Sequence, residues 1–269
     1  MALNFEETLA ASLRRDLPAH DTPFAIGFSG GGDSTALLYA LRAHAARVHV
    51  FIVDHGLRKG SAAEALTAKA RAEKWGFKAQ VLTSFFGPLY SAIQEEARRF
   101  RYRLIADAMR ALKLSFLVTG HTQDDQAETC LMRYDRNTEW RGAAGMARKT
   151  YAPVWPELAG ITVVRPLLDV TRATLRGYNR AHDLVWAEDP SNENRKFTRI
   201  RTRDRLRNDT GLRDLLLDTA RDLRQGLNAE NEEMQRWSAR YAQINPQGYI
   251  QLSRVPPKQL LMHLSLIHI

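Results

Sequence analysis

The run Ser-Gly-Gly-Gly-Asp-Ser at residues 29–34 combines residue types that bind phosphate. Glycines let backbone N–H groups turn toward an anion at close range, and the helix predicted to follow adds positive potential. Ser29 and Ser34 add hydroxyl donors, whereas Asp33 would repel a phosphate unless a Mg²⁺ ion lies between them. No Gly-Lys-Ser/Thr follows, so the run differs from a Walker A loop. The alternative is a glycine turn in which Asp33 only caps the helix.

Asp54 and His55 follow a predicted strand at residues 48–53, within the run Val-Asp-His-Gly-Leu-Arg. Ligands of open α/β sheets bind outside the carboxyl ends of the strands, so this segment is placed to hold a nucleoside beside the phosphate loop. A plain polar loop is the alternative, and the segment alone does not separate the two.

Another polar segment, residues 120–129, follows a predicted strand and reads Gly-His-Thr-Gln-Asp-Asp-Gln-Ala-Glu-Thr. His121, Asp125 and Glu128 are spaced by four and three residues, which places them on one face at a helix start. Imidazole and carboxylate groups together suit metal binding or general base catalysis. The alternative is a helix N-terminus whose acidic residues only complement the helix dipole.

Arginine is concentrated in two segments, residues 96–103 and 195–207. The first interleaves arginine with aromatic residues, a combination that suits phosphates and stacked bases. In the second, Arg199 and Arg203 lie four residues apart and so face one way on a helix. With a formal net charge of +9, the sequence favours a polyanion such as nucleic acid as a partner. Solvated helix faces are the alternative.

The elements that position these residues alternate between short apolar strands and helices over the first half of the chain. Predicted strands cover residues 24–28, 48–53, 79–83 and 115–119, and predicted helices cover residues 35–46, 62–75, 91–112 and 124–134. The alternation predicts an α/β fold, a doubly wound parallel sheet with helices on both faces.

The second half of the chain becomes helical. We expect a loop over 135–156, a late strand near 161–167, a helix over 171–182 and a long amphipathic run over 213–242 that breaks near Gly226. The expected domains are therefore residues 1–205, which carry the phosphate loop, and a small helical domain over 206–269. The abrupt apolar end of the sequence is consistent with a truncated second domain.

Composition excludes several classes of protein. The single cysteine, Cys130, excludes a disulfide framework and any cysteine-based zinc or iron–sulfur site. No run of 18 apolar residues exists, so a membrane span is not expected. The first residues include acidic side chains and lack the basic start and apolar centre of a signal peptide, so we expect a cytoplasmic protein.

Taken together, these segments resemble a known family. The run 29–34 is similar to the phosphate loop of the N-type ATP pyrophosphatases, the PP-loop superfamily. Within it, the chain resembles the tRNA(Ile)-lysidine synthetase family from about Phe24 to Arg203. The segments that carry the resemblance are VDHGLR, EARRFRYR, GHTQDDQAET, RPLL and WAEDPSNENRKFTRIRTR, in the family's order. DDQAET and EDPSN together are far more specific than the phosphate loop.

The resemblance implies an ATP-dependent ligase that acts in two steps. ATP adenylylates the C2 carbonyl oxygen of the wobble cytidine in tRNA(Ile) with a CAU anticodon, and pyrophosphate is released. The ε-amine of free L-lysine then attacks C2 and AMP leaves, which forms lysidine. The implied cofactors are ATP and Mg²⁺, and the implied partners are this tRNA and L-lysine, with no membrane. A homodimer is left open.

Matched positions imply roles for individual residues. The phosphates of ATP would be bound by Ser29, Gly30, Gly31, Gly32, Asp33 and Ser34, with Asp54 and His55 completing the nucleotide site. The catalytic residues would be Asp33, which is also the metal ligand, His121, Asp125 and Arg201. Arg201, or its neighbour Arg199 or Arg203, would contact phosphate or tRNA.

The chain also departs from the family pattern. Residues 134–146 replace the short Arg-Gly-Ser-Gly stretch that usually stands there, and the chain ends before the further tRNA-binding domains of many members. The alternatives are another PP-loop pyrophosphatase, such as a tRNA thiolase or a GMP or NAD synthetase, and a non-catalytic nucleotide- or RNA-binding relative. The lone cysteine argues against a thiolase. The retained acidic residues Asp33, Asp124 and Asp125 argue against a non-catalytic relative.

Overall fold

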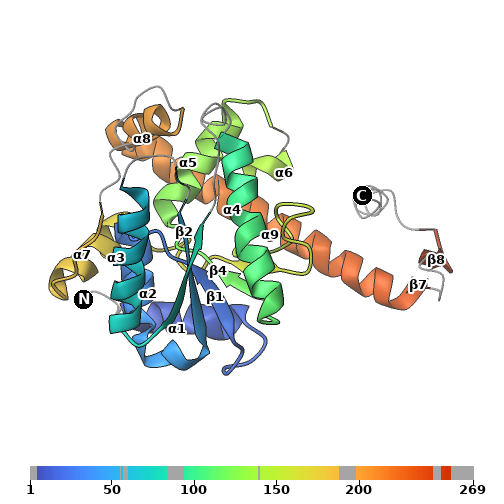
Figure 1. Ribbon diagram of the computed structural model, residues 1–269. Coiled ribbons are helices and arrows are strands. Elements are labelled where there is room, and N and C mark those ends of the chain that lie inside the picture. The colour runs from blue at the N-terminus through green and yellow to red at the C-terminus, as the bar shows by residue number, and fades with distance from the viewer. Residues whose placement is uncertain are drawn as a thin grey trace. The chain divides into compact units, whose positions relative to one another are not determined.

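The chain divides into two compact units. The computed structural model describes residues 5–54, 56, 60–83, 94–138, 140–187, 198–244 and 250–255 (Figure 1). The first unit comprises Met1–Thr129 and Met146–Asn208, and the second comprises Cys130–Gly145 and Asp209–Ile269. The segment from 130 to 145 thus belongs with the later helices, although it precedes part of the first unit in the sequence.

A mostly parallel sheet forms the centre of the first unit. The described strands are β1 (Phe24–Gly27), β2 (Val48–Asp54), β3 (Lys78–Thr83), β4 (Phe116–Val118), β5 (Lys149–Tyr151) and β6 (Thr162–Val164). Their order is β3-β2-β1-β4-β6-β5, and every neighbouring pair is parallel except β5 with β6. The parallel sheet predicted from the alternating pattern is confirmed. The chain moves from β1 outward to β3 and then back to β4, so the switch in strand order lies between β1 and β4.

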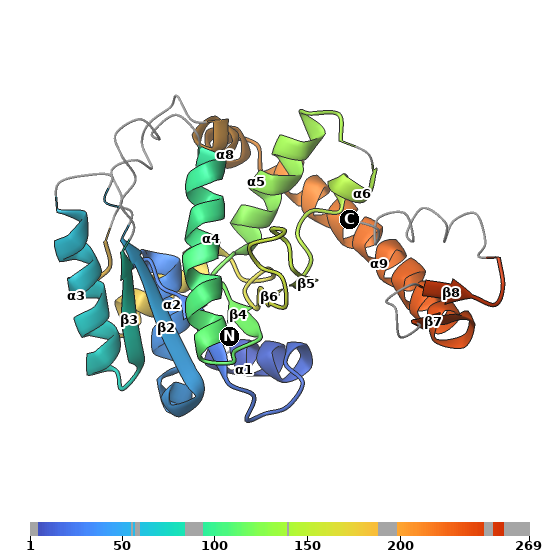
Figure 2. The ribbon, with the colours of Figure 1, turned by 45° about the vertical axis from the view of Figure 1, so that its right-hand side comes forward.

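Helices cover the sheet (Figure 2). Those of the first unit are α1 (Phe5–Asp16), α2 (Gly32–Ala40), the 3₁₀ helix η1 (Arg42–Arg47), α3 (Ser61–Lys74), α4 (Gln94–Ala111), α7 (Arg172–Ala181) and α8 (Thr198–Asn208), with α5 (Gln123–Tyr134) shared between the units. The helix predicted over 35–46 in fact ends at Ala40, where the chain tightens into η1 around the buried Leu41. Across the described residues, no helix has both the length and the apolar character needed to cross a membrane.

Alternate residues of the central strands enter two separate hydrophobic clusters. Phe24 and Ile26 of β1 pack in the cluster that also contains apolar residues of α1, α2 and α3. Ala25 of the same strand faces the opposite cluster, where Ile105 and Met109 of α4 are buried. Strand side chains alternate between the two faces of a sheet, so a strand that is apolar at every position must be covered on both faces.

The loop expected over 135–156 contains regular structure. A short helix, α6 (Trp140–Ala143), and strand β5 lie within it. The Arg133 side chain donates hydrogen bonds to the carbonyl oxygens of Gly142 and Gly145, at 2.8 and 2.9 Å, and thereby folds the α6 segment back toward α5. The expectation of a simple loop is therefore wrong, because the Arg133 side chain of α5 and the pairing of β5 with β6 supply hydrogen bonds to this segment.

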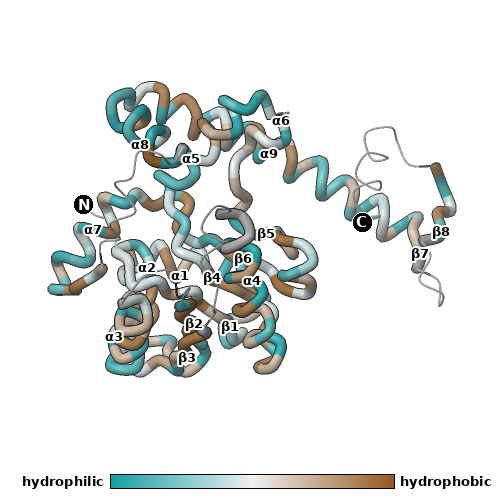
Figure 3. The backbone as a smooth tube through the Cα atoms, turned by 45° about the horizontal axis from the view of Figure 1, so that its top comes forward, coloured by the Kyte–Doolittle hydropathy of each residue, from teal (hydrophilic) through white to brown (hydrophobic). Residues whose placement is uncertain are grey.

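The second unit is built on one long helix. Helix α9 runs without interruption from Thr210 to Tyr241, and Asp209 caps it by accepting a hydrogen bond from the Leu212 N–H at 2.8 Å. Hydrophilic and hydrophobic positions alternate along its tube in Figure 3. The expected break at Gly226 is wrong, because one helical glycine costs only about 1 kcal/mol relative to alanine. Strands β7 (Ala242–Ile244) and β8 (Ile250–Leu252) follow as an antiparallel pair.

Candidate nucleotide-binding site

The glycine run connects β1 to α2 at the carboxyl end of the strand. Gly30 has a φ of 75°, a left-handed conformation that favours glycine, and Gly31 occupies the N-cap position of α2 without a side-chain cap. The hydroxyl oxygens of Ser29 and Ser34 lie 3.1 Å apart, and the Gly31 N–H donates to Ser29 Oγ at 3.4 Å. The loop thus places two hydroxyls and the first turn of a helix at one point, an arrangement that binds anions.

Later parts of the chain hold this loop in place. The Gly30 carbonyl oxygen accepts hydrogen bonds from the Ala187 N–H at 2.9 Å and the Thr35 hydroxyl at 3.3 Å. The buried Asn179 of α7 donates to the Gly32 carbonyl oxygen at 2.9 Å. These hydrogen bonds to the Gly30 and Gly32 carbonyl oxygens hold the loop conformation in the absence of a ligand.

The segment after β4 approaches the phosphate loop closely. A Cβ atom at Gly120 would lie 3.6 Å from the backbone nitrogen of Ser34. The segment after β4 and the first turn of α2 are therefore in contact through their backbones. His121 follows, with its Nδ1 2.8 Å from the Thr119 hydroxyl oxygen. Burial, only partly offset by Asp125, lowers the pKa of His121 to about 4. The imidazole is therefore neutral at pH 7.

Asp125 caps its own helix and also forms an ion pair. Its Oδ2 accepts hydrogen bonds from the Thr122 N–H and hydroxyl, both at 2.9 Å, and the Asp125 N–H donates back to the Thr122 hydroxyl at 3.3 Å. Its Oδ1 accepts from Arg172 at 2.8 Å. Burial raises the pKa of Asp125, but Arg172 and the Thr122 N–H more than offset this and leave it below its ordinary value.

Arg172, the first residue of α7, joins the acidic residues of the site. Its Nε donates to Asp33 at 3.2 Å, its Nη1 to Glu128 at 3.2 Å and its Nη2 to Asp125 at 2.8 Å. Its backbone N–H donates to Asp124 at 2.7 Å. The three helix starts of α2, α5 and α7 therefore converge on one guanidinium group at the switch between β1 and β4.

Glu128 is the most deeply buried of these carboxylates, at 1% exposed. Besides Arg172, it accepts hydrogen bonds from Arg203 at 2.8 Å and Arg199 at 3.1 Å, both on α8. One face of α8 is thus attached to the site through ion pairs. The arginine pair that the sequence places on one side of a helix faces a protein carboxylate here.

The structure brings most of the predicted site residues together. Those that meet at the carboxyl ends of β1 and β4 are Ser29, Gly30, Gly31, Gly32, Asp33, Ser34, His121 and Asp125. Asp54 is buried at the end of β2, where its Oδ1 accepts from the Gly56 N–H at 3.0 Å. His55 lies outside the described residues. Arg201 is exposed on α8 and donates to the Thr198 hydroxyl at 3.3 Å.

Sequence reasoning missed Arg172. Its only local signal is its place one residue after Thr171, whose hydroxyl caps α7 by accepting from the Thr174 N–H. The spacing of Glu128 marked it as a candidate site residue, but its pairing with Arg172, Arg199 and Arg203 was not predicted. Neither role can be found without the fold, because Arg172 and Asp33 are 139 residues apart.

Asp33 fits one of the arrangements in which proteins bind Mg²⁺. The described residues contain no group of three His, Cys, Asp or Glu side chains that could hold a metal ion by themselves. Mg²⁺ bound together with a nucleotide needs only one or two carboxylates, because phosphates and water complete its shell. Asp33 Oδ2 accepts from Arg172, and Oδ1 has no hydrogen bond within the described part of the chain. One carboxylate oxygen beside the phosphate loop suits such an ion.

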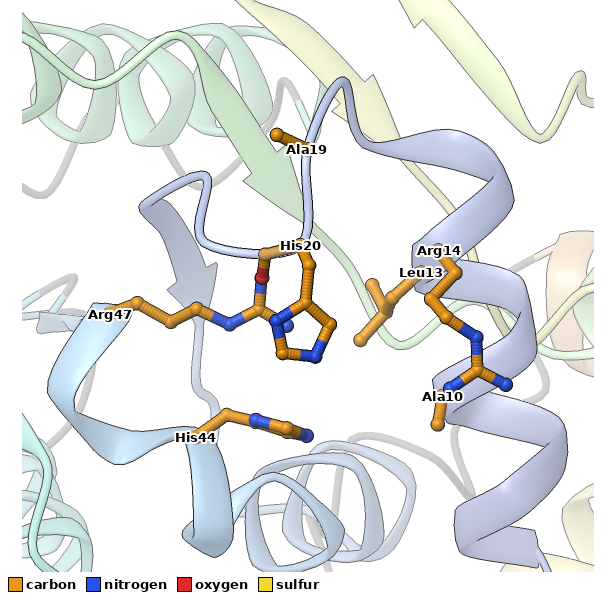
Figure 4. Close-up of a pocket in the computed structure, with 7 residues that line it drawn as sticks. All are labelled: Ala10, Leu13, Arg14, Ala19, His20, His44 and Arg47. Carbon is orange, nitrogen blue, oxygen red and sulfur yellow. The ribbon is translucent and has the colours of Figure 1, made fainter.

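A small cavity elsewhere in the first unit is separate from this site. Figure 4 shows it between α1 and η1, with the rings of His20 and His44 and the side chains of Arg14 and Arg47 around it. The segments that line it precede β1 and β2, so it lies at the amino ends of these strands. Its volume of about 50 Å³ is too small for a nucleotide.

The neutral state of His121 predicts a specific pH dependence of stability. The unfolded chain binds a proton at His121 below its ordinary pKa of about 6.5, whereas the folded chain does so only near 4. Stability is therefore lost as the pH falls from 6.5 to 4. We expect protonation of His121 to lower the free energy of unfolding by about 2 kcal/mol between pH 7 and pH 5. Urea denaturation of the wild type and of His121→Gln at both pH values measures this loss. Equal losses in the two proteins would contradict it.

Fold and site together define an α/β protein with an anion-binding loop after its first strand. The chain belongs to the PP-loop domain family, whose family model matches residues 1–210. Membership implies that the chain uses ATP.

Individual relatives narrow the comparison. The chain is 42% identical over 204 residues to the tRNA(Ile)-lysidine synthase of Hyphomonas neptunium, covering 74% of this chain and 54% of that protein. It is 44% identical over 190 residues to the tRNA(Ile)-lysidine synthase of Mesorhizobium japonicum, covering 66% and 40%. The chain thus spans about half the length of the curated relatives it matches. A solved structure of the U34-tRNA thiolase NcsA from Methanococcus maripaludis has a similar fold, with a TM-score of 0.64, 17% identity and coverage of 81% of this chain and 77% of that one.

Proposed function

We propose that the chain ligates L-lysine to C2 of the wobble cytidine of tRNA(Ile) with a CAU anticodon, in two steps that consume ATP. One observation supports the proposal most directly. The phosphate loop lies next to the segment that carries His121 and Asp125, at the carboxyl ends of β1 and β4. The proposal assigns activation of the carbonyl to the phosphate loop and binding of the incoming amine to the neighbouring His121 and Asp125 segment. Relatives at 42% and 44% identity are named for this product.

In the first step, the cytidine carbonyl oxygen attacks the α-phosphorus of ATP and pyrophosphate leaves. A urea-like carbonyl is a poor electrophile, so the bound AMP supplies a leaving group for the next step. The hydroxyls of Ser29 and Ser34 and the first N–H groups of α2 bind the phosphates and stabilise the charge on the departing pyrophosphate. Asp33 would hold Mg²⁺, which neutralises phosphate charge when it is bound.

In the second step, the lysine ε-amine attacks C2 and AMP departs. Asp125 is ionised at pH 7, so it attracts the ε-ammonium group electrostatically. The neutral His121 orients the amine by accepting a hydrogen bond. The proton that the nitrogen loses as the C–N bond forms must pass to a nearby acceptor, and His121 is the neutral base at this position. Arg201, exposed on α8, would contact an RNA phosphate.

Cysteine chemistry, which a tRNA thiolase of similar fold would require, is not supported. Cys130 is the only cysteine of the chain. It is buried, and burial raises the pKa of its thiol to about 11. Since the thiolate is the reactive form, Cys130 is unreactive at pH 7.

The test is incubation of the chain with ATP, Mg²⁺, labelled L-lysine and a transcript of tRNA(Ile) with a CAU anticodon. We expect labelled lysidine on nucleoside analysis, with one AMP and one pyrophosphate released for each lysine incorporated. A transcript with uridine at the wobble position is the control and should incorporate no label. Release of pyrophosphate with ammonia but not with lysine would instead identify an amidating synthetase, and absence of any tRNA-dependent ATP consumption would overturn the proposal.

A further inference from the structure

Two large aromatic side chains are exposed on one loop of the first unit. Tyr151 ends β5 and is 65% exposed, and Trp155 follows in the connection to β6 and is 55% exposed. Residues 151–160, here called the aromatic loop, also bury Val154 and Leu158 in the core. The exposed rings are therefore not the result of a loose segment, because their immediate neighbours are anchored.

Arginines of α4 hold the aromatic loop in position. Arg99 donates to both carboxylate oxygens of the buried Glu157, at 2.9 and 3.2 Å, and to the Trp155 carbonyl oxygen at 3.2 Å. Arg110 donates to the Glu157 carbonyl oxygen at 2.7 Å. The Trp155 carbonyl oxygen and the backbone and side chain of Glu157 are thus held by α4. The Trp155 indole is exposed on this anchored part of the loop.

The surface around Trp155 is cationic. Between residues 98 and 110, α4 carries five arginines against one aspartate. Arg99 and Arg103 both pair with Glu157, and their side chains remain 46% and 59% exposed. Exposed positive charge attracts a polyanion, and exposed aromatic rings stack on unpaired bases.

We propose that the aromatic loop binds unpaired nucleotides of the tRNA, with Trp155 stacking on a base, Tyr151 beside it and the arginines of α4 contacting the flanking phosphates. The inference rests on the proposed function, because it takes the partner to be the substrate RNA. A protein partner is disfavoured, since the core of a protein interface is depleted in charge, whereas Arg99 donates to the Trp155 carbonyl oxygen and Arg103 pairs with Glu157 of the same loop.

Binding of fluorescently labelled tRNA(Ile) transcript to Trp155 variants tests the inference. Stacking on one base predicts about tenfold weaker binding for Trp155→Ala and a smaller loss for Trp155→Phe, which keeps a ring. Trp140→Ala is the matched control, because Trp140 is an exposed tryptophan of the second unit, at 45%. It should bind like the wild type.

A second measurement reports stacking directly. Tryptophan emission should be quenched when the RNA is added to the wild type, and Trp155→Phe should lose that quenching while folding normally by circular dichroism. If the wild type makes lysidine and binds tRNA but Trp155→Ala binds equally well, the inference fails and the proposed function stands. If the wild type does not bind tRNA, the proposed function fails first. A change in self-association without a change in RNA affinity would identify the loop as a protein interface and would also overturn the inference.

Discussion

Asp33→Asn is expected to lower Mg²⁺-dependent pyrophosphate release about 10³-fold, because a metal ion that neutralises phosphate charge contributes several kcal/mol to the transition state. Asparagine keeps the size of the side chain and can still accept a hydrogen bond from Arg172. It removes the charge that Mg²⁺ needs. The rate is measured as tRNA-dependent release of pyrophosphate from ATP at saturating Mg²⁺.

The control for this prediction is Asp209→Asn. It removes the same charge from the cap of α9, in the second unit, where Asp209 accepts a hydrogen bond from the Leu212 N–H. Its turnover should equal that of the wild type. Should Asp33→Asn retain wild-type turnover, Asp33 serves only the start of α2 and its pair with Arg172.

Removal of Arg172 is expected to have the largest effect on stability. Arg172→Gln leaves Asp33, Asp125 and Glu128 without the guanidinium that joins them, and Glu128 is 1% exposed. Breaking a buried ion pair by deleting one partner leaves an uncompensated charge and costs about 3–5 kcal/mol. Arg199 and Arg203 still pair with Glu128, so the lower part of this range is expected. The unfolding free energy from urea denaturation measures it.

Two further variants serve as comparisons for the stability of Arg172→Gln. Arg221→Gln breaks an exposed pair with Asp218 and should cost less than about 1 kcal/mol. The double variant Arg172→Gln with Asp33→Asn should recover part of the stability lost in Arg172→Gln, because it removes the Asp33 charge that pairs with Arg172. If Arg172→Gln costs no more than Arg221→Gln, the guanidinium does not hold the carboxylates together.

Local patterns predicted the scaffold of the site well. A short apolar strand, a glycine run and a helix are all signals within a few neighbouring residues, so the placement of residues 29–34 at the junction of β1 and α2 followed from the sequence. The same reasoning placed His121 and Asp125 at the start of α5, and the parallel sheet brings both segments to one edge. The spacing of His121, Asp125 and Glu128 predicted one shared helix face. Arg172 contacts Asp125 and Glu128, whereas His121 precedes α5.

The roles of the arginines could not be predicted from composition. Both basic segments suit nucleic acid by their charge, yet Arg99 pairs with Glu157, and Arg199 and Arg203 pair with Glu128. An arginine on a predicted helix has the same local signal whether it faces solvent or a buried carboxylate. The partner is 58 residues away in the first case and more than 70 in the other two.

The sequence by itself determined the alternation of strands and helices, the position of the phosphate loop and the polar residues at the strand ends, because these depend on periodicity and on the conformational freedom of glycine. Only the tertiary structure decided that Arg172 links Asp33, Asp125 and Glu128 and that β5 pairs with β6 within an apparent loop. Each of these depends on hydrogen bonds, ion pairs or packing between residues far apart in the chain, whose energies no local pattern contains.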